Sequence, residues 1–361
     1  MARRCSLIGV FILCAVLLTS AVPCRAAGWS CTEFALPAIE GAAFWPKVSG
    51  NWAVALMNTS TNNANSTIGV VYYDLANRQV YSVYAGKAAE HCISGNTIAW
   101  SGKIDNIPVL RGMCGTRGTW PSCLTLYDVS SGTYVAPKLK TNSAFVISIS
   151  GNQVAYELGC RINLYNIATG AQRRISDNQP LHRSPDIGGD LVVWQQYEDR
   201  TFKKSSVMCY RISTGQTFQV PDSAPSNSRA YTDGNTIVWS TTTGANVYDV
   251  KTRATRFIQG AQFPDVSNGM VVYLKGSASG CGCSGSTTAG RGVYGTDLSS
   301  KGEFRISKGT ADRPPSIDNR RVVWARGGVV YCADITKVSG TGVGTGVPRG
   351  IPVPRVGKQP N

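Results

Sequence analysis

Short apolar runs alternate with polar turns along most of the chain, and one six-residue phrase recurs. The phrase is Gly-Asn or Gly-Asp followed by an apolar run that ends in an aromatic residue or its replacement. Five copies begin at glycine and two degenerate copies at asparagine: Gly50, Gly95, Gly151, Gly189, Gly234, Asn268 and Asn319. The starts lie about 34 to 56 residues apart, which indicates a repeat architecture whose units bury their apolar faces against one another.

Each repeat predicts four short strands. A strand such as Pro185–Ile187 leads into the Gly-Asn turn, and both turn residues tolerate the positive φ of a tight hairpin. The apolar run is the second strand, a segment such as Leu126–Val129 the third, and one such as Gln172–Ile175 the fourth. The pattern predicts an all-β chain folded as a seven-bladed β-propeller of four-stranded antiparallel blades.

The ends of the chain predict how the ring closes. The last repeat offers three strands and no fourth, whereas Glu33–Leu36 near the N-terminus resembles the fourth strand Glu303–Ile306. We therefore expect the N-terminal strand to complete the last blade, which hides two free strand edges at once.

The repeat also carries a family resemblance. The pattern Pro-x-Ile-Ser-Gly-Asn-x-Val-Val-Trp, then Tyr-Asp-Val, then Arg-Ile-Ser resembles the TolB-like family of propeller repeats over residues 32–335. The resemblance implies a propeller in a periplasmic or cell-surface protein and assigns no single role. The usual Ser-Pro-Asp-Gly turn is replaced by Ser-Gly-Asn, and no segment resembles the amino-terminal domain of periplasmic TolB. We therefore do not expect the TolB role in the outer membrane.

The chain divides into three predicted parts. Residues 1–27 read as a secretory signal with Arg3 and Arg4, an apolar core and a Cys24-Arg-Ala26 cleavage site. Residues 28–335 form the propeller, and residues 336–361 form a flexible, basic tail rich in Gly and Pro. Pro23 before Cys24 disfavours lipidation, and no later stretch has the ~18 apolar residues of a membrane span. We expect a monomer that is secreted, periplasmic or on the cell surface; a retained signal anchor is the alternative.

The net charge narrows the choice of partners. The formal charge is +15, and loss of Arg3, Arg4 and Arg25 with the signal leaves +12. Such a charge favours anionic partners, including acidic polysaccharides and other cell-envelope polymers, although a basic surface can also serve solubility. Nucleic acid is not an expected partner, because the chain is exported and has no basic run interleaved with aromatic residues.

Nine of the 12 cysteines lie beyond the signal, which predicts disulfides in an exported protein. Cys114 and Cys123 share one loop and form the first candidate pair. Cys31 and Cys332 would lie on neighbouring strands of the closing blade and form the second. Cys281 and Cys283 lack a third ligand at metal spacing, so we predict no metal and no cofactor.

The loops predict which face binds. Turns between strands 1 and 2 and between strands 3 and 4 are uniformly short, whereas the other loops carry insertions at 58–67, 101–123, 195–206 and 274–291. Insertions on one face of a repeat array mark the binding face, which we call the variable face. Its candidate binding residues, with Trp120 for stacking on a sugar, are Arg111, Arg117, Trp120, His182, Arg183, Lys203, Lys204, Lys275 and Arg291. Ordinary solvated loop charge is the alternative.

A second set of candidates lies on the innermost strands. One position per blade, just before the Val or Ile of Pro-x-Ile, can approach the central channel. It holds Lys47, Asp186, Tyr231 and Asp265, and elsewhere Cys92, Ser148 and Ser316. The two aspartates could bind a cation or polar ligand, or simply cap neighbouring turns.

Catalytic motifs are scarce. The chain has two histidines, His91 and His182, no Gly-x-Ser-x-Gly elbow and no Asp box of the sialidase type. The sequence therefore predicts a secreted, non-catalytic binding platform that engages a protein or anionic glycan through its variable face. The alternative is a carbohydrate-active lyase or glycosidase with carboxylates at the channel mouth.

Overall fold

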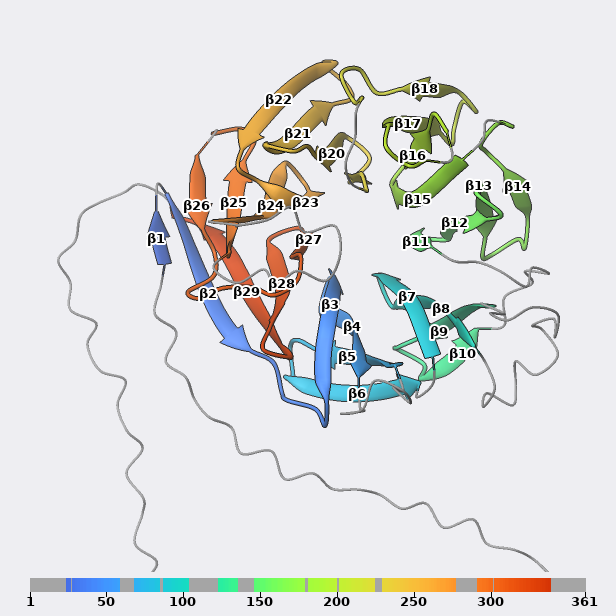
Figure 1. Cartoon of the computed structure of the whole chain (residues 1–361). Helices are drawn as coiled ribbons and strands as arrows, with labels where there is room; N and C mark the ends of the chain where they lie inside the picture. The colour runs from blue at the N-terminus through green and yellow to red at the C-terminus, as the bar shows by residue number, and fades with distance from the viewer. Residues whose placement is uncertain are drawn as a thin grey trace, which may run out of the picture.

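The computed structural model describes residues 24–26, 28–58, 68–84, 87–103, 123–135, 146–178, 181–199, 201–224, 229–276, 291–300 and 302–338. All regular structure in these residues is β-strand, arranged as a ring of seven four-stranded antiparallel blades around a central axis (Figure 1). The predicted seven-bladed β-propeller is therefore confirmed.

The strands follow one another from the centre of the ring outward in blades 1 to 3. Blade 1 contains β3 (Ala42–Ser49), β4 (Trp52–Asn58), β5 (Ile68–Asp74) and β6 (Gln79–Tyr84). Blade 2 contains β7 (Lys87–Ser94), β8 (Thr97–Lys103), β9 (Cys123–Asp128) and β10 (Thr133–Val135). Blade 3 contains β11 (Ile147–Ser150), β12 (Gln153–Leu158), β13 (Arg161–Asn166) and β14 (Gln172–Arg174).

The same order holds in blades 4 to 6. Blade 4 contains β15 (Leu181–Gly188), β16 (Leu191–Tyr197), β17 (Ser205–Arg211) and β18 (Thr217–Gln219). Blade 5 contains β19 (Tyr231–Thr232), β20 (Thr236–Ser240), β21 (Gly244–Asp249) and β22 (Ala254–Gln259). Blade 6 contains β23 (Gln262–Ser267), β24 (Met270–Lys275), β25 (Gly292–Asp297) and β26 (Glu303–Arg305).

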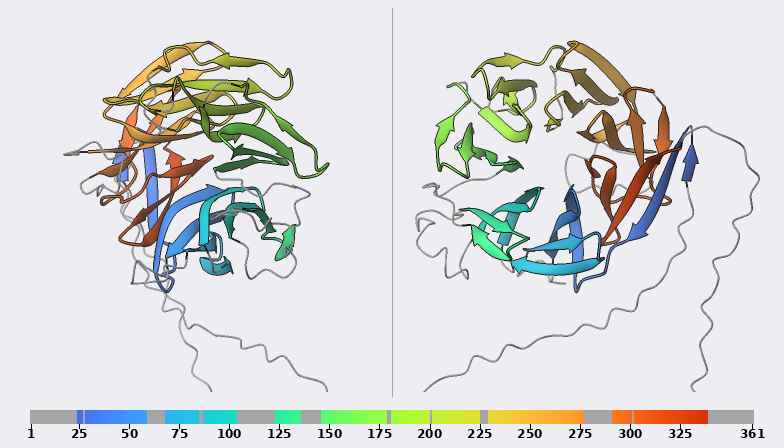
Figure 2. Two further views of the ribbon diagram at one scale, coloured as in Figure 1. Left: turned by 45° about the vertical axis from the view of Figure 1, so that its right-hand side comes forward. Right: turned by 180° about the vertical axis from the view of Figure 1, so that it is seen from behind.

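Blade 7 closes the ring as predicted. Its strands are β27 (Ser316–Asp318), β28 (Arg321–Arg326), β29 (Val329–Lys337) and the N-terminal β2 (Trp29–Ala35), with β1 (Cys24–Ala26) outside β2. In both views of Figure 2 the N-terminal strand lies beside the last strands of the chain. The N-terminal strand therefore joins the two ends of the propeller through backbone hydrogen bonds.

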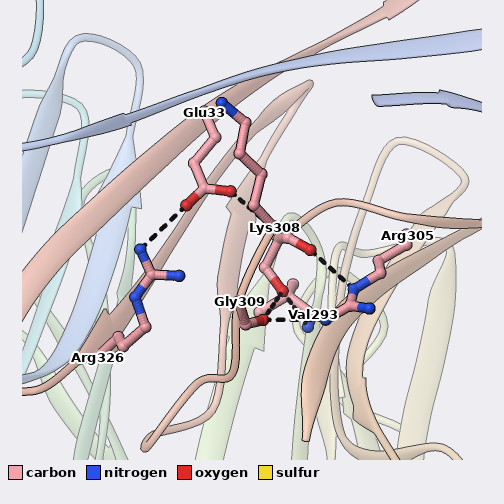
Figure 3. Close-up of polar contacts among 7 residues, drawn as sticks. Glu33, Val293, Arg305, Lys308, Gly309 and Arg326 are labelled. Carbon is pink, nitrogen blue, oxygen red and sulfur yellow. Dashed lines mark hydrogen bonds and ion pairs between the residues drawn. The ribbon is translucent and has the colours of Figure 1, made fainter. Parts of the chain in front are cut away.

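A buried carboxylate reinforces this closure. Glu33 on β2 accepts a 2.6 Å hydrogen bond from the backbone N–H of Lys308 and lies 3.3 Å from Nη2 of Arg326 on β28 (Figure 3). Ser307, beside Lys308, accepts the N–H of Val293 on β25 at 2.9 Å. Glu33 therefore connects the N-terminal strand to blade 7 and to the segment arriving from blade 6.

The recurring aromatic residue of the second strand packs between blades. Trp100, Trp194, Trp239 and Trp324 are at most 1% exposed. Each shares its apolar cluster with residues of the preceding blade; Trp100, for example, lies with Val54 and Val70 of blade 1. Burying four such large side chains explains why the repeat keeps this position aromatic.

The serine of the Ser-Gly-Asn turn connects neighbouring blades in the same way at several junctions. Its hydroxyl accepts the backbone N–H of the glycine that opens the next blade's turn, as Ser49 does from Gly95 at 2.9 Å. Between blades 7 and 1 the equivalent acceptor is Asp318, whose carboxylate accepts the N–H of Gly50 at 2.6 Å. Five of the seven junctions show this bond; the other three donor–acceptor pairs are Gly151–Ser94, Gly189–Ser150 and Asn319–Ser267.

The register of blade 7 separates one candidate disulfide pair. Cys31 lies opposite Ile335, and Cys332 lies opposite Phe34. The Cys31–Cys332 disulfide is therefore absent from the structure, because the two residues are offset along adjacent strands. Cys114 lies outside the described residues, and so does the side chain of Cys123. The part of the chain that the structure describes contains no helix that could cross a membrane.

Candidate binding site at the channel mouth

The innermost strands enclose a polar central channel. All seven channel positions named from the sequence line a cavity of about 310 Å³: Lys47, Cys92, Ser148, Asp186, Tyr231, Asp265 and Ser316. The end near the Gly-Asn turns is lined by residues such as Ser49 and Asn268. The other end opens on the variable face, where each inner strand begins.

A second cavity, of about 290 Å³, lies at this opening, and we call it the channel mouth. Most of its wall comes from one equivalent position in six blades, two residues before the channel position. The residues at this position are Trp45, Glu90, Ser184, Arg229, Phe263 and Pro314. Pro46, Lys47, His91 and Tyr231 complete the lining.

Backbone bulges shape three of these wall positions. The pairing of the first two strands shifts register at Trp45, Ser184 and Phe263, and each residue has a positive φ of 51° to 55°. Each also precedes a proline, a position that normally favours extended backbone. Left-handed backbone at residues other than glycine is unfavourable, and such strain concentrates at functional sites.

Basic side chains lie against the aromatic rings of the mouth. Lys47 Nζ is 4.7 Å and Arg229 Cζ 5.4 Å from the ring centroid of Tyr231. Arg313 Cζ lies 5.8 Å from Trp45, and Arg291 Cζ lies 6.0 Å from Phe263. These distances suit cation–π contacts, which place positive charge on all three rings.

The acidic groups of the channel hold neighbouring blades together. Asp186 accepts the N–H of Thr232 in blade 5 at 2.9 Å and the hydroxyl of Ser148 in blade 3 at 2.8 Å. Asp265 accepts the N–H of Ile317 in blade 7 at 3.2 Å. Burial raises the pKa of Asp186. The two aspartates therefore accept hydrogen bonds that connect neighbouring blades. This is a structural role of the kind that the sequence left open as the alternative to ligand binding.

Two mouth residues, Lys47 and Glu90, retain polar groups for a ligand. Lys47 makes no hydrogen bond or ion pair with a described residue, and Glu90 approaches only Arg229 Nη1, at 3.7 Å. Burial lowers the pKa of Lys47, but Coulombic attraction to Tyr231, Asp265 and Asp186 outweighs it and leaves the pKa raised. Burial, aided by the charge of Lys47, lowers the pKa of His91 to about 3, so the imidazole is neutral.

The predicted binding residues of the variable face do not converge. Lys203 and Lys204 are exposed, and Arg183 lies over Phe202 at 4.7 Å. Lys275 instead pairs with Glu303 on β26, 2.7 Å away at the outer edge of blade 6. Arg291 is buried against Phe263. Arg111, Arg117 and Trp120 lie outside the described residues.

The placement of His182 differs from the expected surface loop. It lies within β15 and is fully buried. Its Nδ1 accepts a 3.0 Å hydrogen bond from the indole of Trp194, and its Nε2 lies 2.9 Å from Asp177. Burial lowers its pKa. The ring therefore supports the packing of Trp194 and is not available to a ligand.

Four residues of the mouth were not recognised from the sequence as members of one site: Trp45, Glu90, Arg229 and Phe263. A usable signal was present, because an aromatic residue precedes proline at equivalent positions in blades 1 and 6. Among the described residues, no group of three or more His, Cys, Asp or Glu could hold a metal ion.

Together, the fold and the channel define a seven-bladed β-propeller with a lined mouth on its variable face. No family model matches the chain, and no curated protein sequence is similar to it. Solved structures similar in fold include acylaminoacyl peptidase from Pyrococcus horikoshii, with a TM-score of 0.55 and 12% identity over 82% of this chain. The match spans only 52% of that peptidase.

Two further structures bear on the comparison. Oligogalacturonate lyase from Vibrio parahaemolyticus has a TM-score of 0.53 and 12% identity, covering 87% of this chain and 96% of the lyase. TolB from Acinetobacter baumannii has a TM-score of 0.45 and 12% identity, covering 79% and 80%. At such identities the similarity concerns the fold alone.

Proposed function

We propose that the chain is a non-catalytic binding propeller that holds an acidic glycan on its variable face, centred on the channel mouth. The observation that carries this proposal is the pairing of each mouth aromatic ring with a basic side chain. Aromatic rings offer flat apolar surface to a sugar ring, and the basic groups offer charge to its acidic substituent.

The roles of the acidic residues favour binding over bond cleavage. A glycosidase needs two carboxylates free to act on the glycosidic bond. Here Asp186 and Asp265 accept backbone N–H groups of neighbouring blades, so using either in catalysis would weaken the ring. His91 stays neutral because its pKa is about 3, and this makes it a poor general acid near neutral pH.

The charge of the whole chain supports the same partner. Exposed Lys203 and Lys204 add positive charge in the β16–β17 connection of blade 4, on the variable face. A basic protein exported through its N-terminal signal would meet the acidic polymers of a cell envelope or its surroundings. Charge of this kind speeds association and makes it sensitive to salt.

The test is retention of the processed protein on immobilised polygalacturonate and on neutral galactan, at low and high salt. We expect salt-sensitive retention on the acidic polymer, weak retention on the neutral one, and no shortening of either. Shorter oligosaccharides in the eluate would overturn the non-catalytic role. Equal behaviour on both polymers would overturn the preference for acidic glycans and leave a protein as the partner to seek.

A further inference from the structure

The channel mouth adjoins the deeper channel cavity. The mouth and the deeper channel cavity share four lining residues, Lys47, His91, Arg229 and Tyr231, which we call the neck. Pockets for small molecules typically measure about 300–1,000 Å³. The mouth, at about 290 Å³, is therefore sized for the end of a ligand and not for a folded segment.

The neck presents a charged donor to the mouth. Lys47 lies over the face of Tyr231, and its ammonium makes no hydrogen bond or ion pair with a described residue. A lysine ammonium has three N–H donors, and a partly buried one left without acceptors is unfavourable. An anionic group entering from the mouth would supply those acceptors.

The walls define the rest of the ligand. Trp45 is 45% exposed and offers an apolar ring near the opening of the mouth. Arg313 lies against the same ring, with Cζ 5.8 Å from its centroid. Glu90 makes no hydrogen bond with a described residue and can accept from hydroxyl groups. A cationic ligand is disfavoured, because basic side chains already lie against Trp45, Tyr231 and Phe263.

We infer that the mouth binds the terminal ring of an acidic glycan end-on, and that this ring is a uronate. Its carboxylate lies on the Lys47 ammonium, its ring packs on Trp45, and its hydroxyls donate to Glu90. This inference rests on the proposed function and adds to it the ligand's terminal unit and its orientation.

Calorimetric titration of the processed protein with trigalacturonate and with neutral galactotriose tests the inference. We expect trigalacturonate alone to bind, at one site per chain. Lys47→Met should weaken it roughly ten- to a hundredfold, since a hydrogen bond to a charged group is lost. Trp45→Ala, a change at an exposed side chain, should weaken it without affecting the fold. The matched control is Lys275→Met, which removes the same charge from the outer edge of blade 6 and should leave binding unchanged.

The outcomes separate this inference from the proposed function. If polygalacturonate binds the wild type and Lys47→Met equally, the acidic-glycan role stands and end-on binding is wrong. If neither trigalacturonate nor polygalacturonate binds the wild type, both are wrong. Equal binding of galactotriose would overturn the uronate assignment, and equal weakening by Lys275→Met would show that only overall charge matters.

Discussion

The carboxylate of Glu33 lies 3.3 Å from the guanidinium of Arg326, joining residues 293 positions apart in the sequence. Glu33 is only 7% exposed, and its second oxygen accepts the N–H of Lys308. Arg326 also lies over the ring of Tyr331 at 3.8 Å. A single carboxylate therefore fixes the N-terminal strand, β28 and the segment after β26 at the point where the ring closes.

Replacing this carboxylate should loosen the closure. We expect Glu33→Ala to lower the free energy of unfolding by about 3 kcal/mol, because it leaves a partly buried arginine without its partner. Glu33→Gln keeps an acceptor for Lys308 and should cost less. Asp334→Ala is the control, since it breaks the more exposed pair with Arg321 and should cost about 1 kcal/mol or less. Urea denaturation measures all three, and equal losses would contradict a special role for Glu33.

Gly188 should be intolerant of any side chain. A Cβ there would lie 2.2 Å from the backbone oxygen of Thr232 in blade 5, so the two blades would have to separate. This close approach explains why blade 4 has glycine where four of the other repeats have serine and two have aspartate. We expect Gly188→Ala to cost about 3 kcal/mol, at the upper end of overpacking effects. Gly302→Ala, whose Cβ would meet only Ser300 at 3.6 Å, should be nearly neutral in the same thermal unfolding assay. A mild effect at Gly188 would mean that the junction can adjust.

The repeat made the architecture predictable, because each recurring residue has the same structural role in several blades. The tryptophans fill the interfaces between blades, and Ser49 and its equivalents join successive turns. Even the closing strand was predictable, since Glu33–Leu36 matches the missing fourth strand in pattern. Local periodicity therefore carried almost all the information needed for the fold.

The candidate site was less predictable, because its residues are brought together by the closed ring and not by local periodicity. Trp45 and Phe263 lie more than 200 residues apart and meet only because the ring closes and a bulge turns each one toward the mouth. His182 was misjudged because its neighbours suggested a loop, whereas β15 begins at Leu181 and buries the ring against Trp194. The ion pair of Lys275 with Glu303 could not be read from the charges along the loops, because Glu303 belongs to another strand.

Both histidines should have a pKa below that of an unfolded histidine, about 6.5, and His91 should stay neutral far below it. Burial lowers the pKa of His91 to about 3 and also lowers that of His182. The unfolded chain therefore binds protons between pH 6.5 and 5 that the folded chain does not, so stability falls as the pH falls. The loss is at most about 1.4 kcal/mol per pH unit for each histidine.

Nuclear magnetic resonance of the imidazole signals and denaturation at several pH values check this prediction. His91 should not titrate above pH 5, and His182 should titrate below the pKa of an unfolded histidine. Raised pKa values at Asp186 and Glu157, both caused by burial, act in the opposite direction at acid pH. The comparison of wild type with His91→Asn removes that shared contribution, and the wild type should lose stability more steeply from pH 6.5 to 5. A His91 signal with a midpoint near 6.5, or parallel stability curves for the two proteins, would show that His91 is open to solvent and not buried as in the structure.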